Sequence, residues 1–468
     1  MTPSPPAPLP LAALAQAGRA PALPLDLVLP DGQGLRLERL LRVLPGRRYV
    51  GLGQWQGHSV FVKLLVGPKA GRDFAREAQG AAWLAGGGLP TPQRRAQGFA
   101  AGAGWLFFDW LADGQSLFSL WQAAQRQPLP EREAAQRALL EEALPVIARL
   151  HAQGLWQADL HLENLMRAGG KLWLIDGGGI RAQTPGQPLA RDRALANLGV
   201  LFGQLPLSAQ PWLSAALPAY TPNVQAGELP KLQRAIEAER AIRLKDFLKK
   251  TQRDCSLFSL KKNAEGITLV LREEEAALAP LLADPDAYIE AGHLYKTGGA
   301  ATVAKVEVGG RPLVVKRCNI KHFRHWLGRF WRPSRAAHSW QEGWRLTALG
   351  IPTAKPLALI ERRRFGLRGV AYLVTEYLEG ENALAAPLSA PQKQALENLM
   401  QALASERLVH GDLKGTNLIW QTDHWALIDL DAQHVARNAT AFERGHQRDW
   451  ARLQKNWPEE VFKGANNQ

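Results

Sequence analysis

The chain has 468 residues, a length that exceeds one ordinary hydrophobic core and predicts two or three domains. A composition of 46% hydrophobic and 21% charged residues is typical of a globular protein and excludes an intrinsically disordered chain. The net charge of +14 predicts an anionic partner: a nucleotide, a nucleic acid, a phosphosugar or an acidic membrane surface. Two cysteines, Cys255 and Cys318, provide neither a disulfide framework nor a metal-spaced cluster, which favours a reducing cytoplasm.

A proline-rich segment opens the chain, and proline favours extended polyproline conformations. We therefore expect a flexible tail over residues 1–21, with ordered structure beginning near Leu25. The short apolar run Leu11–Ala17 lacks the basic start of a secretory signal. No apolar stretch reaches the roughly 20 residues of a membrane span. The protein is therefore expected to be soluble or peripheral to a membrane.

Residues 22–225 are predicted to form a first domain that begins with strands and continues with helices. Short apolar runs separated by turn residues over 25–65 are typical of hairpin-linked strands. A helix is expected over Asp73–Leu84, because its apolar residues share one face and a run of glycines ends it. A buried strand at Trp105–Phe108 and a helix over Glu131–His151 follow.

Residues 226–255 are predicted to form a basic connecting helix over about Leu229–Lys250. Two interpretations of its lysines and arginines remain open: a solvated connecting helix, which we favour, or a binding surface. Residues 256–468 then repeat the plan of the first domain, with early strands, a helix through Trp340–Leu349 and a strand at Tyr372–Thr375. Each half is thus expected to contain a β-rich lobe followed by a helical lobe.

The same short signature occurs once in each half. The first copy reads Gln-Ala-Asp-Leu-His-Leu-Glu-Asn over Gln157–Asn164, and the second reads His-Gly-Asp-Leu-Lys-Gly-Thr-Asn over His410–Asn417. In both copies an asparagine follows the aspartate by five residues, and a second aspartate, preceded by Leu-Ile, follows it by seventeen. An apolar strand ending in a lysine, Lys63 or Lys316, precedes each copy. Any one of these patterns occurs by chance, but the ordered set is not expected twice.

These residue types are the ones that phosphoryl transfer requires. A strand lysine holds nucleotide phosphates, and a carboxylate on a rigid loop accepts the proton of the acceptor hydroxyl. An amide oxygen and a second carboxylate can ligate Mg²⁺, which prefers oxygen ligands. ATP and Mg²⁺ are therefore the expected cofactors. The pattern assigns these roles: phosphate contact to Lys63 and Lys316, base to Asp159 and Asp412, and metal ligation to Asn164, Asp176, Asn417 and Asp429.

These features together predict an α+β protein of two tandem protein-kinase-like domains, each with a β-rich N-lobe and a helical C-lobe. The second copy, with its Leu-Ile-Asp-Leu-Asp run ending at Asp431 and its Gly-Ile-Pro-Thr turn, resembles the lipopolysaccharide core kinases, the heptose and Kdo kinase family of Gram-negative bacteria. The resemblance covers about 257–457 and is looser over 25–205. It implies transfer of the ATP γ-phosphate to an inner-core sugar at the cytoplasmic face of the inner membrane. It also implies that Lys414 is a loop lysine near the γ-phosphate.

A helix glutamate that pairs with the strand lysine is a further expected part of such a site. The first copy has Glu77 at this position. When the two halves are aligned on Pro90 and Pro352, the second copy has Ser339 there. Because residues three apart share a helix face, we expect Glu342 to substitute for the missing glutamate.

The first copy departs from the family pattern in its loop. Gln157 stands at the position of the loop-opening histidine, and His161 stands at the position of the loop lysine. Asp-Leu-His also occurs in small-molecule kinases of this fold, so the first domain is either catalytic or supporting. Gly177–Gly179 predict a mobile segment after Asp176. Further glycines either cover the nucleotide or form hairpin turns: Gly51, Gly53 and Gly57 in the first copy, Gly298 and Gly299 in the second.

Two more features suggest positions for charged groups. The dipeptides Arg191-Asp192 and Arg448-Asp449 are predicted to supply the same buried aspartate, which steadies the loop in each copy. Between Lys316 and Ser339 lies a segment that is basic and aromatic and contains no acid. We favour its contact with an anionic bilayer surface or a phosphorylated glycolipid over the alternative of a solvated N-lobe helix. Nucleic-acid binding is not favoured, because no nucleic-acid-binding module accompanies the segment.

Three hypotheses about function follow from the sequence. The first is a cytoplasmic, membrane-peripheral kinase whose acceptor is lipopolysaccharide core or another phosphosugar glycolipid. The second keeps the kinase fold but makes the acceptor a protein hydroxyl or a small molecule. The third is a scaffold of two degenerate kinase folds that binds without catalysis.

Overall fold

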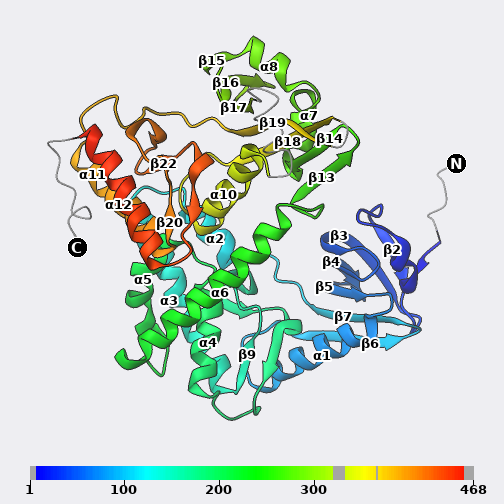
Figure 1. The fold of residues 1–468 in the computed structure, drawn as a ribbon. Helices are drawn as coiled ribbons and strands as arrows, with labels where there is room; N and C mark the ends of the chain where they lie inside the picture. The colour runs from blue at the N-terminus through cyan, green and yellow to red at the C-terminus, as the bar shows by residue number, and fades with distance from the viewer. Residues whose placement is uncertain (1–6, 320–332, 365–366, 458–468) are drawn as a thin grey trace. The chain divides into compact units, whose positions relative to one another are not determined.

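The computed structural model describes residues 7–319, 333–364 and 367–457, and Figure 1 shows its ribbon. The chain forms two compact units, each with a seven-stranded sheet. Unit 1 comprises Met1–Leu205 and Pro211–Arg240, and unit 2 comprises Pro206–Gln210 and Ala241–Gln468. The division between the units falls inside one long helix, because the two ends of that helix contact different units.

The sheet of unit 1 has the strand order β1-β2-β3-β4-β5-β7-β6, and neighbouring strands from β2 onward are antiparallel. Leu35 and Leu37 are buried on one face of β3, whereas Arg36 between them is exposed, which is the alternation of a strand with one face on a core. The strands have these bounds: β1 (Leu9–Pro10), β2 (Leu25–Val28), β3 (Gly34–Leu44), β4 (Arg48–Trp55), β5 (His58–Leu65), β6 (Arg94–Ala100) and β7 (Ala103–Asp109).

Helix α1 (Ala70–Gly86) connects β5 to β6 and packs against the sheet. Ala70 on the helix is buried together with Leu65 of β5 and Leu106 of β7. The residues predicted to be helical, Asp73–Leu84, lie within α1. This packing places Glu77 on the buried side of the helix, near the lysine of β5.

Residues 7–21, the described part of the flexible tail predicted for residues 1–21, are docked on the sheet. β1 pairs in parallel with β2, and the 3₁₀ turn Leu11–Gln16 buries Leu11 and Leu14, each 1% exposed, in the core of the sheet. The prediction was wrong because proline content indicates only local stiffness, whereas two buried leucines stabilise the docked segment by the area they remove from water.

The docking of this N-terminal segment on the sheet should contribute measurably to the free energy of unfolding. We expect Leu14→Ala to lower the free energy of unfolding by about 2–4 kcal/mol, because it leaves a cavity in a packed core. Leu9→Ala is the matched control, since Leu9 is 45% exposed and should change the stability by less than about 0.5 kcal/mol. Urea denaturation followed by circular dichroism measures both. Equal effects of the two variants would contradict the docking.

The second part of unit 1 is helical, with short strand pairs around the loop Gln157–Asn164. β10 lies between β8 and β11, and β9 pairs with β12. The elements have these bounds: α2 (Leu117–Ala124), α3 (Glu131–Ala152), α4 (Arg191–Phe202), α5 (Gln210–Ala216), β8 (Gln115–Ser116), β9 (Leu155–Gln157), β10 (Leu165–Ala168), β11 (Lys171–Leu174) and β12 (Ile180–Ala182). Two-residue to four-residue strands of this kind hold a loop at both of its ends.

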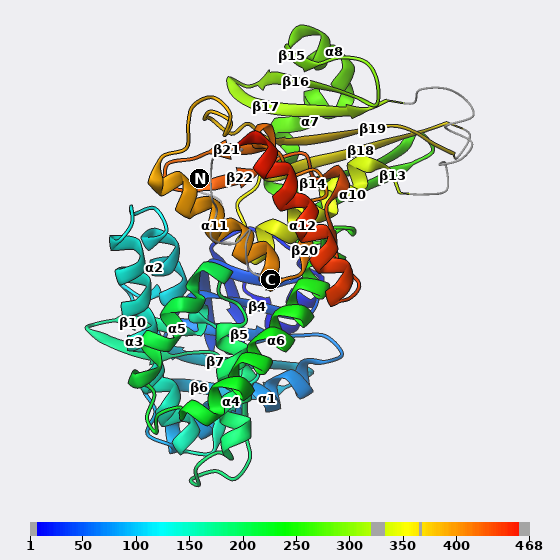
Figure 2. The same cartoon turned by 60° about the vertical axis from the view of Figure 1, so that its left-hand side comes forward.

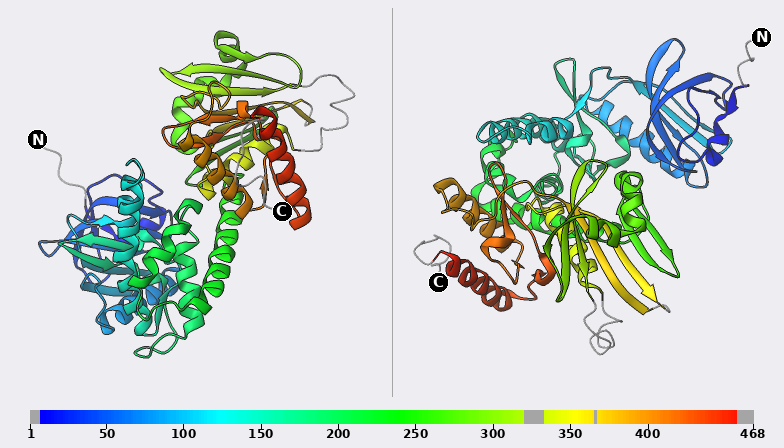
Figure 3. Two further views of the ribbon diagram at one scale, coloured as in Figure 1. Left: turned by 90° about the vertical axis from the view of Figure 1, so that its left-hand side faces the viewer. Right: turned by 90° about the horizontal axis from the view of Figure 1, so that it is seen from above.

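Helix α6 (Leu229–Lys250) has the bounds predicted for the basic helix, and Figure 3 shows it as one continuous helix. Part of it is not solvated as expected: Leu232 and Ile236 are buried within unit 1, and Leu248 is buried within unit 2. Lys249 is exposed to solvent, as predicted for the basic residues of this helix, and forms an ion pair with the exposed Asp246. The helix is therefore a structural part of both units.

The sheet of unit 2 has the order β13-β14-β18-β19-β17-β16-β15, and Figure 2 shows these strands side by side. The run β15-β16-β17-β19-β18 repeats the order β3-β4-β5-β7-β6 of unit 1, and in both units a helix follows the third strand of the run. The strands have these bounds: β13 (Phe258–Asn263), β14 (Gly266–Leu271), β15 (His293–Lys296), β16 (Ala301–Val308), β17 (Arg311–Cys318), β18 (Pro356–Arg364) and β19 (Leu367–Glu376).

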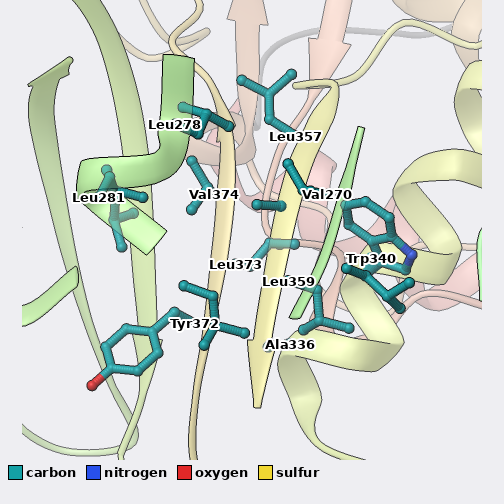
Figure 4. Packing of buried hydrophobic residues seen from close by; sticks show 14 of the residues in the cluster. Val270, Leu278, Leu281, Ala336, Trp340, Leu357, Leu359, Tyr372, Leu373 and Val374 are labelled. Atoms are coloured by element: carbon teal, nitrogen blue, oxygen red, sulfur yellow. The ribbon is translucent and has the colours of Figure 1, made fainter. Parts of the chain in front are cut away.

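Among the described helices, α7 (Glu275–Ala283), α8 (Pro285–Ala291) and α10 (Arg335–Leu349) pack on this sheet. Figure 4 shows Leu278 and Leu281 of α7 and Trp340 of α10 packed with side chains of β14, β18 and β19. Trp340 also donates a hydrogen bond from Nε1 to the carbonyl of Thr251 at 3.0 Å, which satisfies its buried polar atom. The helix that follows the lysine strand is thereby anchored.

The remaining part of unit 2 is short and helical, with α11 (Ala390–Ser405) and α12 (Ala439–Asn456). Two short strand pairs lie between these helices in the sequence: β20 (Leu408–Val409) with β23 (His434–Val435), and β21 (Leu418–Trp420) with β22 (Trp425–Leu427). Leu413 and Leu418 are fully buried in the same core as Leu453 of α12. The mixture of a β-rich and a helical part in each unit is consistent with a kinase-like fold.

Candidate functional site

In unit 2, Lys316 lies on β17 with two aspartates against its ammonium group. Its Nζ is 2.6 Å from Asp429 Oδ1 and 2.7 Å from Asp431 Oδ1. Burial lowers the pKa of Lys316, but the attraction of Asp431 and Asp429 outweighs burial and leaves that pKa above its ordinary value. The lysine is therefore charged at neutral pH. The same attraction holds the pKa of Asp429 below its usual range, although burial opposes it.

The loop that contains Asp412 is held by helix α12. Asp449 on this helix is 2% exposed, and its carboxylate accepts hydrogen bonds from the backbone N–H groups of His410 at 2.8 Å and Gly411 at 3.1 Å. The ring of His410 bonds through Nε2 to the carbonyl of Ile428 at 3.1 Å. The prediction that Asp449 is buried and steadies the loop is therefore confirmed.

The side chains around Asp412 are arranged for proton and metal chemistry. Asn417 donates from Nδ2 to the backbone oxygen of Asp412 at 2.9 Å, which leaves its amide oxygen available as a ligand. Lys414 Nζ lies 3.4 Å from Asp412 Oδ2. Asp429 adopts the left-handed conformation, with φ of +59°. The structure thus brings Asp412, Lys414, Asn417, Asp429 and Lys316 into one region of unit 2.

Glu342 does not take the place of the helix glutamate. Its carboxylate is buried and pairs with Arg345 Nε at 3.0 Å, three residues along the same helix. The expected substitution was wrong because residues that share a helix face still differ in height along the axis by about 4.5 Å. Instead Ser339 Oγ donates to Asp431 Oδ1 at 2.8 Å, so the helix reaches the lysine through Asp431.

In unit 1, Lys63 on β5 pairs with one carboxylate from the helix and one from the loop. Its Nζ is 2.7 Å from Glu77 Oε2 and 2.6 Å from Asp176 Oδ1. Burial lowers the pKa of Lys63, and the attraction of Asp176 and Glu77 outweighs it, so the pKa is raised overall. Arg48 NH1 approaches the other oxygen of Glu77 at 3.5 Å. Both carboxylates predicted to lie near Lys63, Glu77 and Asp176, therefore pair with it.

The loop of unit 1 has the same backbone geometry with different side chains. Asn164 donates from Nδ2 to the backbone oxygen of Asp159 at 3.2 Å, as Asn417 does in unit 2. Gln157 replaces the histidine and donates from Nε2 to the carbonyls of Ile175 and Asp176, both at 3.0 Å. Asp176 has a left-handed φ of +68°, close to that of its counterpart. The first loop therefore keeps its shape without the histidine.

Asp192 is not the buried aspartate of unit 1. Its side chain is 79% exposed and pairs with Lys231 at 3.0 Å. Asn197, one turn further along α4, is buried and donates from Nδ2 to the carbonyl of Gln157 at 2.7 Å. The prediction relied on matching an Arg-Asp dipeptide. Counting from the loop aspartate finds Asn197, thirty-eight residues after Asp159, whereas Asp449 is thirty-seven after Asp412.

The support of the first loop is a chain of neutral groups. His151 donates from Nε2 to Asn197 Oδ1 at 3.0 Å, and its Nδ1 accepts from Tyr220 Oη at 2.8 Å. Burial lowers the pKa of His151 to about 4, and Arg191 adds to the effect. In unit 1 the loop is thus supported by Asn197 backed by the neutral imidazole of His151, whereas in unit 2 it is supported by the carboxylate of Asp449.

This histidine predicts that the stability of unit 1 depends on pH. Between pH 6.5 and about 4 the unfolded chain binds a proton on His151 that the folded unit does not bind. Stability is therefore full above pH 6.5 and should fall by about 3 kcal/mol as the pH drops toward 4, from the size of the pKa shift. Urea denaturation between pH 7 and pH 4.5 measures this loss, and His151→Gln should reduce it. An unchanged pH dependence in His151→Gln would contradict this assignment.

The glycines after Asp176 are packed, contrary to the mobility predicted for them. Gly177–Gly179 form a buried 3₁₀ turn against helix α1. A Cβ at Gly177 would lie 2.7 Å from the backbone nitrogen of Ala81, and one at Gly179 would lie 2.0 Å from Asp159 Oδ1. Glycine is required here for close approach of the chain rather than for flexibility.

The two proposed sets of nucleotide-covering glycines differ in position. Gly51 and Gly53 lie within β4, and a Cβ at Gly51 would lie 2.0 Å from the carbonyl oxygen of Arg39, so they serve strand packing. Gly298 and Gly299 form the turn between β15 and β16, with φ of +75° and +61°, and an added Cβ there would meet no atom within 4 Å. The turn of unit 2 therefore leaves room for the close approach of an anion.

The residues predicted to ligate Mg²⁺ provide one carboxylate and one amide oxygen in each unit. Within the part of the chain that the structure describes, no cluster of three His, Cys, Asp or Glu side chains is arranged for a metal. Mg²⁺ keeps several waters and substrate phosphates, so it needs only one or two protein carboxylates. The donor set therefore fits Mg²⁺.

The expected membrane contact rests on residues that lie mostly outside the described part. These are the basic and aromatic residues Lys321, Phe323, Arg324, Trp326, Arg329, Phe330, Trp331 and Arg332. Arg335 is described, and its NH2 donates to the carbonyl of Ala300 beside the glycine turn. Among the described helices, none has the length and apolar character needed to cross a bilayer.

Comparison with known proteins identifies the family that unit 2 resembles. Residues 286–468 match the family model described as lipopolysaccharide kinase (Kdo/WaaP) family, which is a family of kinases. No curated protein matches the chain. A solved structure described as WaaP in complex with acyl carrier protein matches 43% of this chain and 89% of that chain, with 18% identity and a TM-score of 0.34.

Sequence reasoning did not assign a role to two residues of the sites. Asp431 is part of the Leu-Ile-Asp-Leu-Asp run, and its position two residues after Asp429 was the available signal. Asn197 carried no signal beyond its distance from Asp159. Both residues act through contacts that the order of the sequence does not show.

Proposed function

We propose that the chain is an ATP-dependent kinase that transfers the γ-phosphate to a hydroxyl group of a lipopolysaccharide inner-core sugar, either a heptose or Kdo. The observation that carries this proposal is the grouping of Lys316, Asp412, Asn417 and Asp429 inside the region that matches the lipopolysaccharide kinase family. Unit 2 is the catalytic unit in this proposal, and unit 1 is either catalytic or supporting. The protein acts in the cytoplasm, at the surface of the inner membrane where its glycolipid acceptor is made.

The geometry supports a role for each residue in the transfer. Asp412 accepts the proton of the acceptor hydroxyl, whose oxygen bonds to the γ-phosphorus while the bond to the β,γ-bridging oxygen breaks and ADP leaves. Lys316 contacts the phosphates of ATP, and Lys414 neutralises charge that develops on the transferred group. Asn417 and Asp429 would hold Mg²⁺, which supplies positive charge between the phosphates.

The corresponding residues of unit 1 would bind a second nucleotide. Lys63 and Glu77 are placed as in an active kinase site, and Asp159, Asn164 and Asp176 supply the oxygen atoms. The positive charge of the whole chain favours an anionic, phosphorylated acceptor.

Phosphoryl transfer with purified full-length protein tests the proposal. Labelled ATP and Mg²⁺ are supplied with dephosphorylated core lipopolysaccharide, with peptides or with no acceptor, and mass spectrometry locates the added phosphate. We expect label on a core heptose or Kdo. Label on peptides alone would favour a protein kinase. Absence of Mg²⁺-dependent ATP binding at either site would favour a scaffold without catalysis.

A further inference from the structure

The two strand lysines, Lys63 and Lys316, are each held by two carboxylates, but the second carboxylate comes from a different element in each unit. Asp176 and Asp429 occupy equivalent positions, seventeen residues after the loop aspartate. In unit 1 the second partner is Glu77, on helix α1. In unit 2 it is Asp431, two residues beyond Asp429 on the turn that follows β22.

In each unit, the position equivalent to the second carboxylate of the other unit carries a small residue: Gly178 in unit 1 and Ser339 in unit 2. Gly178 lies two residues after Asp176 and is thus the counterpart of Asp431. A Cβ at Gly178 would lie 2.3 Å from Glu77 Oε1, so the glutamate fills the space of a side chain there. Ser339 is the counterpart of Glu77, and its hydroxyl donates to Asp431 Oδ1 at 2.8 Å. The pairs Glu77/Gly178 and Ser339/Asp431 are therefore reciprocal.

We propose that Asp431 is a positioning residue of the second site, and that it does for Lys316 what the helix glutamate Glu77 does for Lys63. This inference rests on the proposed function, because it concerns how the lysine is presented to the nucleotide phosphates. The carboxylate has been moved from the helix to the turn, and the helix residue has been reduced to a serine that holds the carboxylate in place. In unit 1 the two positions do not both hold an acidic side chain, because a Cβ at Gly178 would clash with Glu77.

The contacts around Asp431 show why it can take this role. Its Oδ1 is shared between Lys316 and Ser339, and Oδ2 faces Arg335 NH1 at 3.9 Å. The turn is also bound to α10 at His338, whose Nε2 donates to the carbonyl of Gln433 at 2.7 Å. Asp431 is thus oriented by α10 from two sides, while Asp429 is more exposed and remains available for a metal.

Nucleotide binding tests the proposal independently of any acceptor. The full-length chain carries Lys63→Met, so that calorimetric titration with a non-hydrolysable ATP analogue and Mg²⁺ reports the second site. Asp431→Gly should weaken binding about tenfold, because the partly buried Lys316 loses one of its two carboxylates. Adding Ser339→Glu to Asp431→Gly rebuilds the arrangement of unit 1 and should restore most of the affinity. Ser339→Glu alone should weaken binding, since both acidic side chains then compete for one space.

Controls separate positioning from general effects on the unit. Glu290→Gln removes an exposed carboxylate of unit 2 and should leave the affinity within twofold. Glu342→Gln tests the alternative that Glu342 of α10, rather than Asp431, positions Lys316. This variant should affect binding less than Asp431→Gly. If Asp431→Gly does not fold, the reciprocal variants Glu77→Ser and Glu77→Ser/Gly178→Asp are compared in a Lys316→Met chain, where the second should bind more tightly.

The outcomes distinguish this inference from the proposed function. Failure of the Lys63→Met chain to bind the analogue would overturn the proposed function of unit 2. Binding by that chain with equal affinity in Asp431→Gly would overturn the role of Asp431 alone. No gain from Ser339→Glu in folded Asp431→Gly protein would also overturn it, because a merely structural role of Asp431 is not restored by a carboxylate on the helix.

Discussion

Asp412→Asn is expected to lower phosphoryl transfer to the core acceptor about 10³-fold, because a general base of this kind contributes roughly that factor. The amide keeps the size and most hydrogen bonds of the carboxylate but cannot accept the proton. Asn417 bonds to the backbone oxygen of Asp412 rather than to its side chain, so the loop should keep its shape. Initial rates with saturating ATP and unchanged circular dichroism measure the effect.

Two comparisons sharpen this experiment. Glu443→Gln removes an exposed carboxylate of α12 and should leave the rate within twofold. Asp159→Asn removes the corresponding group of unit 1, and its effect shows whether the first unit takes part in the transfer. A rate in Asp412→Asn that equals that of the unaltered chain would contradict the assignment of Asp412 as the base.

Asp449→Ala is expected to lower the free energy of unfolding of unit 2 by about 3 kcal/mol. The carboxylate accepts hydrogen bonds from the backbone N–H groups of His410 and Gly411. Its removal leaves both donors without this acceptor. Each such donor costs about 1–3 kcal/mol. The loop of Asp412 would lose its support, so the rate of transfer should also fall. Thermal and urea denaturation of the full-length chain measure the loss of stability.

Asp192→Ala is the matched control for this prediction. The two aspartates follow arginine in the same sequence context, but Asp192 is exposed and should contribute less than about 0.5 kcal/mol. Asn197→Ala is the true counterpart and should destabilise unit 1, because Asn197 holds the carbonyl of Gln157. Similar effects of Asp192→Ala and Asp449→Ala would contradict the assignment.

Residues that follow one another closely could be placed from the sequence. Asp412 and Asn417 are five apart, and a tight turn of that length brings the asparagine back to the backbone of the aspartate in both units. The pairing of Lys63 with Glu77 was also predictable, because a helix directly follows the lysine strand and packs on it. Short connections leave few alternative arrangements.

Contacts between residues that are far apart in the sequence could not be predicted from the sequence. Glu342 and Ser339 are both on α10, and the rotation and height of that helix against the sheet decide which of them approaches Asp431. Side-chain contacts change with shifts of a few ångströms, whereas a sequence pattern specifies only which face of a helix is buried. For the same reason, the docking of Leu11 and Leu14 was not visible in a proline-rich segment.

The sequence by itself determined the duplicated signature, the succession of a β-rich part and a helical part in each half and the residue types of the two sites, because these depend on local spacing and periodicity. The tertiary structure alone decided which second carboxylate pairs with Lys316 and which polar side chain supports the loop of unit 1. Asp431 and Asn197 took these places because packing brought them within hydrogen-bond distance of groups that are far away in the chain. The physical reason is that ion pairs and hydrogen bonds act over about 3 Å, a distance that only the packed chain defines.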